Sequence, residues 1–220
     1  MMKNAVVVLA AAALAALGLT AASQLSSAPV RALPDLAPEA ATASGHVAVL
    51  AGGCFWGMEG LFEHINGVRS VTAGYAGGTA SSANYTEVSS ENTGHAESIR
   101  IDFDPSQVSY GQLLKIYFGV AHDPTQVEGQ YPDSGHSYRS AIFPQNAEQR
   151  QIAAGYIAAL GKAHAFARPI ATRLEQGTFY PAEESHQQFM RRHPNHPYIQ
   201  QWDMPKLQAL RQAFPTFYRS

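Results

Sequence analysis

The spacing of apolar residues predicts strands and helices from about residue 46 onward. Segment 46–50 reads as a short strand, and segment 55–65 has apolar residues at helical spacing. Segment 97–103 alternates between polar and apolar residues, as a half-buried strand does, and an Asp-Pro pair follows it. A helix is predicted over 110–121, with its apolar residues on one face. Further strands are predicted at 68–76, 140–143 and 170–175, and further helices at 145–166, 182–192 and 206–214.

These elements do not follow a strict strand–helix–strand–helix order. Regular alternation is typical of a doubly wound parallel sheet, whereas a mixed order favours helices that cover a sheet in two layers. The sequence therefore predicts an α+β fold in the form of a two-layer sandwich.

The N-terminal residues differ in composition from the rest of the chain. Residues 1–22 have the layout of a secretory signal, because Lys3 precedes an Ala/Val/Leu run that is short and alanine-rich for a stable membrane span. Residues 23–45 are rich in Ala, Ser and Pro and predict a flexible linker, and residues 46–220 have the size of one domain. We therefore expect an exported, periplasmic protein. An uncleaved N-terminal membrane anchor is the alternative.

Charge and cysteine content exclude several classes of function. The 220 residues carry a net charge of -2, which gives no reason to expect nucleic acid or an anionic membrane surface as a partner. One cysteine excludes an intramolecular disulfide, a Cys-x-x-Cys redox pair and a cysteine-rich zinc site. Among the nine histidines, His193 and His196 lie in a polar stretch and are interpreted as solvated loop residues, so no metal site is expected.

The single cysteine, Cys54, lies between a predicted strand and a predicted helix, directly after two glycines. The free N–H groups and the positive dipole of a helix N-terminus favour thiolate over thiol. Phe55 and Trp56 supply an apolar wall beside the sulfur. This context predicts a reactive nucleophile, although a lone cysteine at such a junction can also be a packing residue.

Six motifs occur in a fixed order along the chain and together resemble one enzyme family. They are Gly-Cys-Phe-Trp-Gly (53–57), Gly-Tyr-Ala-Gly-Gly (74–78), Thr-Gly-His-Ala-Glu (93–97), His-Asp-Pro (122–124), Tyr-Arg-Ser-Ala-Ile (138–142) and His-Gln-Gln (186–188). The set closely resembles the A-type peptide methionine sulfoxide reductases, from about residue 47 to residue 217. The resemblance implies an α+β domain with a ferredoxin-like core and long loops. It also implies reduction of methionine (S)-sulfoxide, in proteins and as the free amino acid, in the repair of oxidative damage.

The resemblance assigns the chemical steps to Cys54 and Glu97. Cys54 matches the nucleophile that attacks the sulfoxide sulfur and becomes a sulfenic acid. Glu97 matches the acid that protonates the sulfoxide oxygen. The chemistry agrees with this, because a sulfoxide oxygen leaves only once it is protonated, and a carboxyl group held neutral by an apolar pocket suits that task.

The resemblance assigns five further residues to the binding of substrate. Phe55 and Trp56 match the aromatic wall around the S-methyl group. Tyr85 and Tyr138 match the phenols that hydrogen-bond the oxygen, and phenol donors stabilise charge that develops there. Asp133 matches a carboxylate of the same pocket.

The chain departs from this family pattern in two places. Many relatives carry further cysteines near the C-terminus that resolve the sulfenic acid, whereas this sequence ends without one. We therefore expect an external reductant, a thioredoxin-like protein or a small thiol, and no bound cofactor. The segment 128–133 also differs from the usual Gln-Gly-x-Asp pattern, and Ser137 stands where glutamine is common, which makes the role of Asp133 less secure. A monomer is expected.

Three other functions compete with this interpretation. His95 or His186 is a possible partner of Cys54 in a cysteine hydrolase, although no Asn or Asp stands out to orient the imidazole. A thiol peroxidase also uses a reactive cysteine, but the residues around Cys54 supply aromatic rings and Glu59 rather than an arginine and a hydroxyl. A non-catalytic binder of oxidised methionine would not need Cys54.

Overall fold

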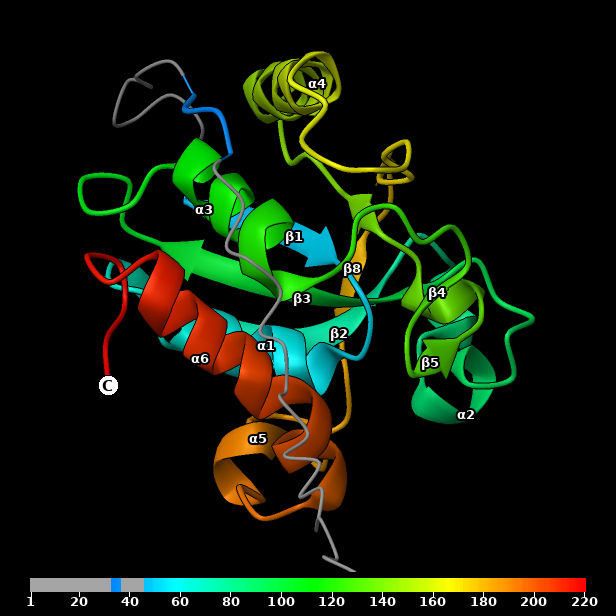
Figure 1. Cartoon of the computed structure of the whole chain (residues 1–220). Helices are drawn as coiled ribbons and strands as arrows, with labels where there is room; N and C mark the ends of the chain where they lie inside the picture. Colours follow the sequence, from blue (N-terminus) through cyan, green and yellow to red (C-terminus); the bar gives the residue numbers. More distant parts are fainter. Residues whose placement is uncertain (1–32, 37–45) are drawn as a thin grey trace, which may run out of the picture.

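The computed structural model describes residues 33–36 and 46–220 (Figure 1). The predicted signal at 1–22 and most of the predicted linker at 23–45 lie outside these described residues. The strands are β1 (Val47–Ala51), β2 (Val68–Ala76), β3 (Ala96–Phe103), β4 (Gly129–Gln130), β5 (Asp133–Ser134), β6 (Ala141–Ile142), β7 (Arg173–Leu174) and β8 (Phe179–Pro181). The helices are α1 (Phe55–Glu63), α2 (Tyr85–Val88), α3 (Tyr110–Ile116), α4 (Ala147–Lys162), α5 (Phe189–Arg192) and α6 (Met204–Ala213).

The central sheet has the strand order β7-β6-β1-β3-β2-β8. Its four inner strands are antiparallel to one another, since β3 pairs antiparallel with both β1 and β2, and β6 pairs antiparallel with β1, whereas the edge strand β7 runs parallel to β6. With α1 between β1 and β2, and α3 between β3 and β6, this is the β-α-β-β-α-β order of a ferredoxin-like core. The predicted α+β sandwich is confirmed, and β7 and β8 extend the sheet at its edges.

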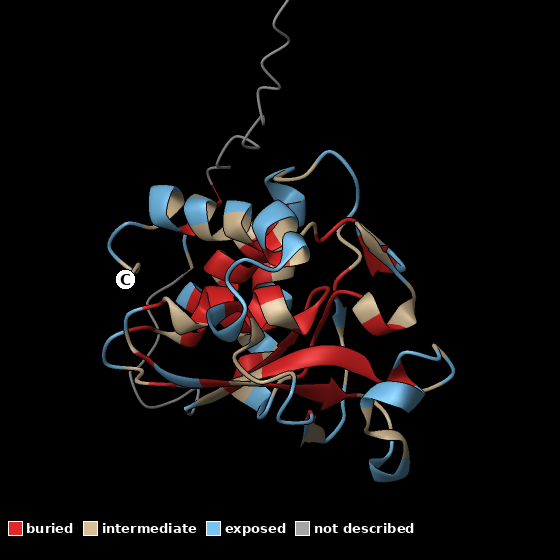
Figure 2. Ribbon diagram, turned by 90° about the horizontal axis from the view of Figure 1, so that it is seen from below, coloured by how far each residue is buried: buried red, intermediate tan, exposed pale blue. Residues whose placement is uncertain are grey.

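The two faces of the sheet are covered unequally. The main core joins α1 and α3 to residues that alternate along the central strands, among them Ile99, Ile101 and Phe103 of β3. The opposite face has a smaller cluster of mostly short side chains, with Phe143 as its largest buried ring. Figure 2 shows the buried residues gathered where the helices meet the sheet. Since Glu97 precedes Ile99 by two positions, its side chain faces the helices.

The segment 182–192 differs from its sequence prediction. Only residues 189–192 form a helix, because Gln188 takes a left-handed conformation at φ 54. The side chain of Gln187 instead donates to the carbonyl of Ala73 and accepts from its N–H, at 2.9 and 3.0 Å. These bonds attach the segment to β2, next to the residues of β2 that pair with β8. The sequence did not predict β8.

Part of the predicted linker packs against the domain. Leu33 is 7% exposed and joins the main core, and Leu36 packs on the same cluster. Asp35 forms an ion pair with Lys115 of α3. The four described residues of this segment are therefore bound to the domain and do not form a free linker.

None of the helices in the described ranges is both long and apolar enough to cross a membrane.

Candidate active site

The side chain of Cys54 stands at the first turn of α1, immediately after β1. Cys54 is the N-cap of α1 and is 8% exposed. Gly53 before it has φ 94, and a Cβ there would lie 2.8 Å from Cβ of Gln130. Glycine therefore lets the β4–β5 hairpin, which carries Gln130, approach the sulfur closely.

Glu97 meets Cys54 because β3 lies beside β1 in the sheet. The backbone N–H of Phe55, the first residue of α1, donates to Oε2 of Glu97 at 2.9 Å. Burial, partly opposed by this N–H, raises the pKa of Glu97 to about 8. Glu97 is thus mostly a neutral carboxyl group near pH 7, as the predicted proton donor requires.

The acidity of Cys54 differs from its sequence prediction. Burial, together with the nearby carboxyl groups of Glu97 and Asp203, raises the pKa of the thiol well above its ordinary value. The backbone N–H of Trp56 acts in the opposite direction and does not compensate. The prediction that the helix N-terminus favours thiolate was therefore wrong, because desolvation outweighs the dipole.

A cavity of about 140 Å³ opens at Cys54 and brings together all seven residues singled out from the sequence. It has one further lining residue, Tyr198, which the sequence did not indicate. The lining residues are Cys54, Phe55, Trp56, Tyr85, Glu97, Asp133, Tyr138 and Tyr198.

The indole of Trp56 is held in place by aromatic neighbours. Its ring stacks on Phe189, with centroids 3.7 Å apart and planes at 8°. Its Nε1–H donates to Nδ1 of His186 at 3.2 Å, and the His186 ring lies 4.4 Å from that of Tyr85. His186 therefore supports two walls of the cavity without lining it.

Tyr85 and Tyr138 reach the cavity from two separate loops. The N–H of Tyr85 donates to Glu183 at 2.8 Å, and the other oxygen of Glu183 accepts from Tyr75 of β2. Tyr138 ends a 3-10 turn, η3 (His136–Tyr138). Burial, with the nearby carboxylate charge of Glu97, raises the pKa of both phenols, so both keep their protons at neutral pH.

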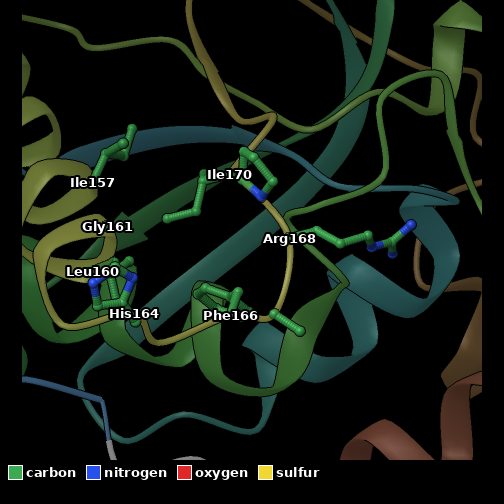
Figure 3. Close-up of a pocket in the computed structure, with 9 residues that line it drawn as sticks. Ile157, Leu160, Gly161, His164, Phe166, Arg168 and Ile170 are labelled. Carbon is green, nitrogen blue, oxygen red and sulfur yellow. The ribbon is translucent and has the colours of Figure 1, made fainter.

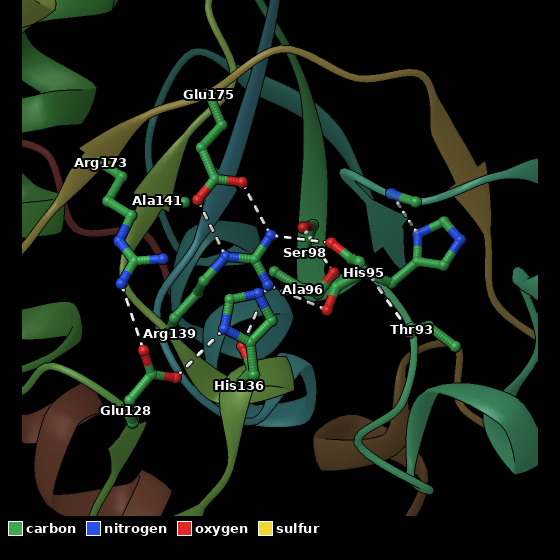
Figure 4. Close-up of polar contacts among 12 residues, drawn as sticks. Thr93, His95, Ala96, Ser98, Glu128, His136, Arg139, Ala141, Arg173 and Glu175 are labelled. Atoms are coloured by element: carbon green, nitrogen blue, oxygen red, sulfur yellow. Dashed lines mark hydrogen bonds and ion pairs between the residues drawn. The ribbon is translucent and has the colours of Figure 1, made fainter.

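A buried arginine fixes the loop that carries Tyr138 to the strand that carries Glu97 (Figure 4). Arg139 is 2% exposed and forms two hydrogen bonds with Glu175, at 2.9 and 2.7 Å. Its guanidinium also donates to the carbonyl oxygens of Gly94 and His95, each at 3.0 Å. Because His95 lies two residues before Glu97, one side chain sets the relative position of two cavity walls.

The β4–β5 hairpin and the segment before η4, a π-helical turn (Ile199–Asp203), close the remaining side of the cavity with Asp133 and Tyr198. Tyr198, directly before η4, donates a hydrogen bond to Asp133 of β5. Burial raises the pKa of Asp133, and the bond from Tyr198 opposes this effect. Tyr198 was missed because a tyrosine in a His-Pro-rich loop has no motif or period to mark it.

The two histidines proposed for a cysteine hydrolase do not line the cavity. His95 is buried, accepts from Gly78 N–H at 3.2 Å and contacts the carbonyl of Thr79 at 3.0 Å. Nδ1 of His186 is taken by Trp56. The lining residues also include no arginine of the kind expected for a thiol peroxidase.

No metal centre is apparent within the described ranges, where no group of three His, Cys, Asp or Glu side chains is placed to hold an ion.

A larger hollow of about 480 Å³ lies at the C-terminal end of α4 (Figure 3). It is mostly aliphatic, and its titratable lining residues are His164 and Arg168, of which Arg168 pairs with Asp123 at 3.0 Å. Without a nucleophile or a buried acid, this hollow does not offer the chemistry that Cys54 and Glu97 provide.

Comparison with known proteins shows one enzyme family. The family model described as peptide methionine sulfoxide reductase matches residues 46–217. The protein named peptide methionine sulfoxide reductase MsrA 2 of Mesorhizobium japonicum is 51% identical over 82% of this chain and 93% of its own. The protein of the same name from Synechocystis is 53% identical over 82% of this chain and 85% of its own.

Two solved structures share the fold. Reduced Mxr1 from Saccharomyces cerevisiae has a TM-score of 0.61 and 31% identity, over 68% of this chain and 86% of its own. Methionine sulfoxide reductase A of Corynebacterium diphtheriae has a TM-score of 0.57 and 31% identity, over 74% of this chain and 85% of its own.

Proposed function

Because the chain belongs to the A-type peptide methionine sulfoxide reductases, we propose that Cys54 and Glu97 perform the chemical steps of that family's reaction in the 140 Å³ cavity. The protein is an oxidoreductase that reduces methionine (S)-sulfoxide at the expense of a thiol and so repairs oxidative damage. One observation carries the assignment of roles. The chain's single cysteine shares a cavity with a carboxyl group that burial keeps protonated near neutral pH.

In the first half of the reaction, Cys54 receives the oxygen atom. The neutral carboxyl of Glu97 and the phenols of Tyr85 and Tyr138 donate to the sulfoxide oxygen, and Sγ of Cys54 attacks the substrate sulfur. The net step converts the sulfoxide to a thioether and the thiol to a sulfenic acid. The substrate sulfur gains two electrons, the Cys54 sulfur loses two, and the sulfenic oxygen carries a proton donated by Glu97.

The raised pKa of Cys54 assigns a second task to Glu97. Because burial raises the pKa of Cys54, the residue is a thiol near neutral pH, and its proton must leave as the sulfur attacks. Once Glu97 has given its proton to the sulfoxide oxygen, it is a carboxylate beside that thiol and accepts the second proton. One carboxyl group therefore acts first as acid and then as base.

The remaining cavity residues orient the substrate. Phe55 and Trp56 form the apolar wall that receives the S-methyl group, and the stacking of Trp56 on Phe189 holds that wall rigid. The hydrogen bond from Tyr198 fixes Asp133 at the mouth. We assign Asp133 and Tyr198 to positioning of the substrate.

In the second half of the reaction, an external thiol regenerates Cys54. One thiol displaces the sulfenic oxygen as water and forms a mixed disulfide, and a second thiol releases Cys54 as the disulfide of the reductant. The reductant is a thioredoxin-like protein or a small thiol. The single cysteine of the sequence supports this route.

A turnover experiment without reductant tests the mechanism. Reduced protein mixed with excess methionine sulfoxide should release at most one methionine per chain and leave a sulfenic acid on Cys54, trapped with a dimedone probe and located by mass spectrometry. Cys54→Ser should release none, since a hydroxyl is a far poorer nucleophile at neutral pH. Continued turnover without thiol, or methionine release by Cys54→Ser, would contradict the mechanism.

We also propose that residues 1–22 direct export to the periplasm and that the enzyme acts as a monomer. The Lys3-led Ala/Val/Leu run supports export, and the cavity formed by one chain supports a monomer. N-terminal sequencing of the periplasmic fraction would test cleavage near residue 22, with an intact leader in the membrane fraction as the contrary result. Light scattering after gel filtration would test the monomer.

A further inference from the structure

Exposed hydrophobic side chains gather on the side of the molecule that carries the active-site mouth. Among the described residues, the large hydrophobic side chains left exposed are Tyr85 at 39%, Val127 at 61% and Tyr131 at 75%. Tyr85 lines the cavity, and Val127 and Tyr131 belong to the loop and hairpin that carry Asp133. A single exposed aliphatic residue such as Val127 is ordinary, but exposed aromatic rings beside a catalytic cavity, here Tyr85 and Tyr131, indicate a binding surface.

Tyr131 is held in a defined position at the turn of the β4–β5 hairpin. Its N–H donates to Oε1 of Gln126 at 2.9 Å. Its ring meets the edge of Trp202 in η4, with centroids 5.1 Å apart and planes at 88°. We call Tyr131 and Trp202 the aromatic rim.

The aromatic rim is continuous with the cavity, because the β4–β5 hairpin and the segment 198–203 contribute residues to both. The hairpin carries Tyr131 and Asp133 two residues apart, and the segment that contains η4 carries Tyr198 and Trp202 four residues apart. Asp133 and Tyr198, which both line the cavity, are hydrogen-bonded to each other. Figure 1 shows β4, β5 and α2 grouped beyond the end of α1 at which Cys54 lies.

Charged groups beside the rim already have partners. Glu128 contacts His136 at 3.1 Å and Arg173 at 3.2 Å, and Lys206 pairs with Asp203 at 3.4 Å. The surface that remains for a ligand is therefore the exposed aromatic surface, which favours an apolar partner over an ionic one.

A polypeptide substrate must lie across this rim. The cavity of about 140 Å³ receives the side chain of one oxidised methionine, so its main chain and its neighbours stay outside. Consecutive Cα atoms are about 3.8 Å apart, which places the side chain of an adjacent residue at the mouth.

Resting on the function proposed above, we propose that the aromatic rim of Tyr131 and Trp202 binds an apolar side chain adjacent to the oxidised methionine in a polypeptide. The rim gives the enzyme a preference for unfolded or mobile polypeptide segments over the free amino acid. Gln130 and Asp133 have the spacing of the ends of the Gln-Gly-x-Asp pattern, so Tyr131 stands at its glycine position.

Steady-state kinetics with a fixed concentration of dithiothreitol test the rim. The substrates are free methionine sulfoxide and capped tripeptides with leucine or serine before, or after, the oxidised methionine. Tyr131→Gly and Trp202→Ala should lower kcat/KM roughly tenfold for at least one leucine peptide, through KM, because truncation of an aromatic contact at an interface costs about that factor. The serine peptides and free methionine sulfoxide should change less than about twofold by the same reasoning.

Two controls make the result specific to the aromatic pair. Tyr131→Phe keeps the ring and should behave as the wild type. Val127→Ala removes another exposed side chain of the same loop and should also keep the preference for leucine. A loss with Val127→Ala equal to that with Tyr131→Gly would overturn the assignment to the pair.

The outcomes separate this inference from the proposed function. An equal loss for every substrate, or no loss for any leucine peptide, would overturn the rim while leaving the reductase intact. A wild-type protein that reduces no sulfoxide would contradict the proposed function. In that event, calorimetric binding of the same peptides to Cys54→Ser and to Cys54→Ser with Tyr131→Gly decides the rim, with equal affinity of the two overturning it.

Discussion

The two sides of the catalytic cavity are built from different kinds of structure. Cys54 and Glu97 come from regular elements at the centre of the fold and are 8% and 4% exposed. Asp133 and Tyr198 come from a two-residue strand and a loop before η4. Buried residues on a sheet and a helix are fixed by many contacts, whereas loop residues tolerate change. The proposed roles follow this division, with the chemical steps assigned to the central side and the contacts to residues around the oxidised methionine assigned to the loop side.

The largest contrast between the two sides should come from removing the proton donor. Glu97→Gln should slow sulfenic acid formation by ~10²-fold or more, in line with general-acid contributions. Single-turnover rates by rapid quench measure this effect. Asp133→Asn, the matched change on the loop side, should cost less. A full rate for Glu97→Gln would transfer the acid role to Asp133.

The pH dependence of the same measurement sharpens the assignment. The pKa of Glu97 is raised to about 8, so the donor is present below that pH and is lost as the pH rises through it. The wild-type single-turnover rate should therefore fall above about pH 8. Glu97→Gln should lack this decline, because glutamine has no proton to lose in that range.

Removal of the phenol hydroxyl of Tyr85 or Tyr138 should lower the single-turnover rate less than Glu97→Gln does. Tyr85→Phe and Tyr138→Phe should each lower the single-turnover rate by on the order of tenfold, the value of one hydrogen bond to a developing charge. The remaining phenol still donates, so the double variant should lose more than either. A single variant as slow as Glu97→Gln would mean that this tyrosine protonates the oxygen.

The smallest effect on activity should come from Glu59, which supports the central side from behind. Its side chain is buried on α1, accepts from Gln188 N–H at 2.7 Å, and has a pKa raised by burial to about 7. The folded state keeps this proton between the ordinary value of 4.5 and about 7, whereas the unfolded chain releases it. Stability must therefore fall as the pH rises through that window.

Glu59→Gln should reduce the slope of the free energy of unfolding against pH between 4.5 and about 7. In the wild type, the titration of Glu59 lowers the free energy of unfolding by at most about 3 kcal/mol between pH 4.5 and 7, and the variant should lack this contribution. Urea unfolding at several pH values measures it. A decline from about pH 4.5 to about 8 should remain, because Glu97 also keeps, up to its raised pKa of about 8, a proton that the unfolded chain releases. An unchanged slope below pH 7 would show that Glu59 is ionised in the folded protein.

The sequence predicts the central side better than the loop side. The strand before Cys54, its helix and the strand of Glu97 follow from local periodicity, whereas the ferredoxin-like core was expected only from the family resemblance. The acidity of Cys54 does not, because it depends on Glu97 and Asp203, which are distant in the chain. Local dipole reasoning gave the wrong sign, since it omitted a desolvation that only the tertiary structure creates.

Loop features were missed for a related reason. The predicted helix at 182–192 fails at Gln188, whose left-handed backbone is stabilised by a hydrogen bond to Glu59 on another helix. Leu33, in the predicted linker, is buried by residues far along the chain. Tyr198 reaches the cavity only because η4 packs beside α1. Each depends on a long-range contact that no local pattern encodes.

The small cavity at Cys54 also fixes the order of events in a turnover. A cysteine that is 8% exposed and faces a space of about 140 Å³ does not have room for the oxidised side chain and a reducing thiol together. Methionine must depart before the reductant arrives, so the two reactants alternate at one entrance and the enzyme shuttles between two stable covalent forms. Excess reducing thiol can therefore occupy the cavity of the reduced enzyme and block the sulfoxide, and excess sulfoxide can block the oxidised enzyme in the same way. The turnover rate then depends on the ratio of the two concentrations.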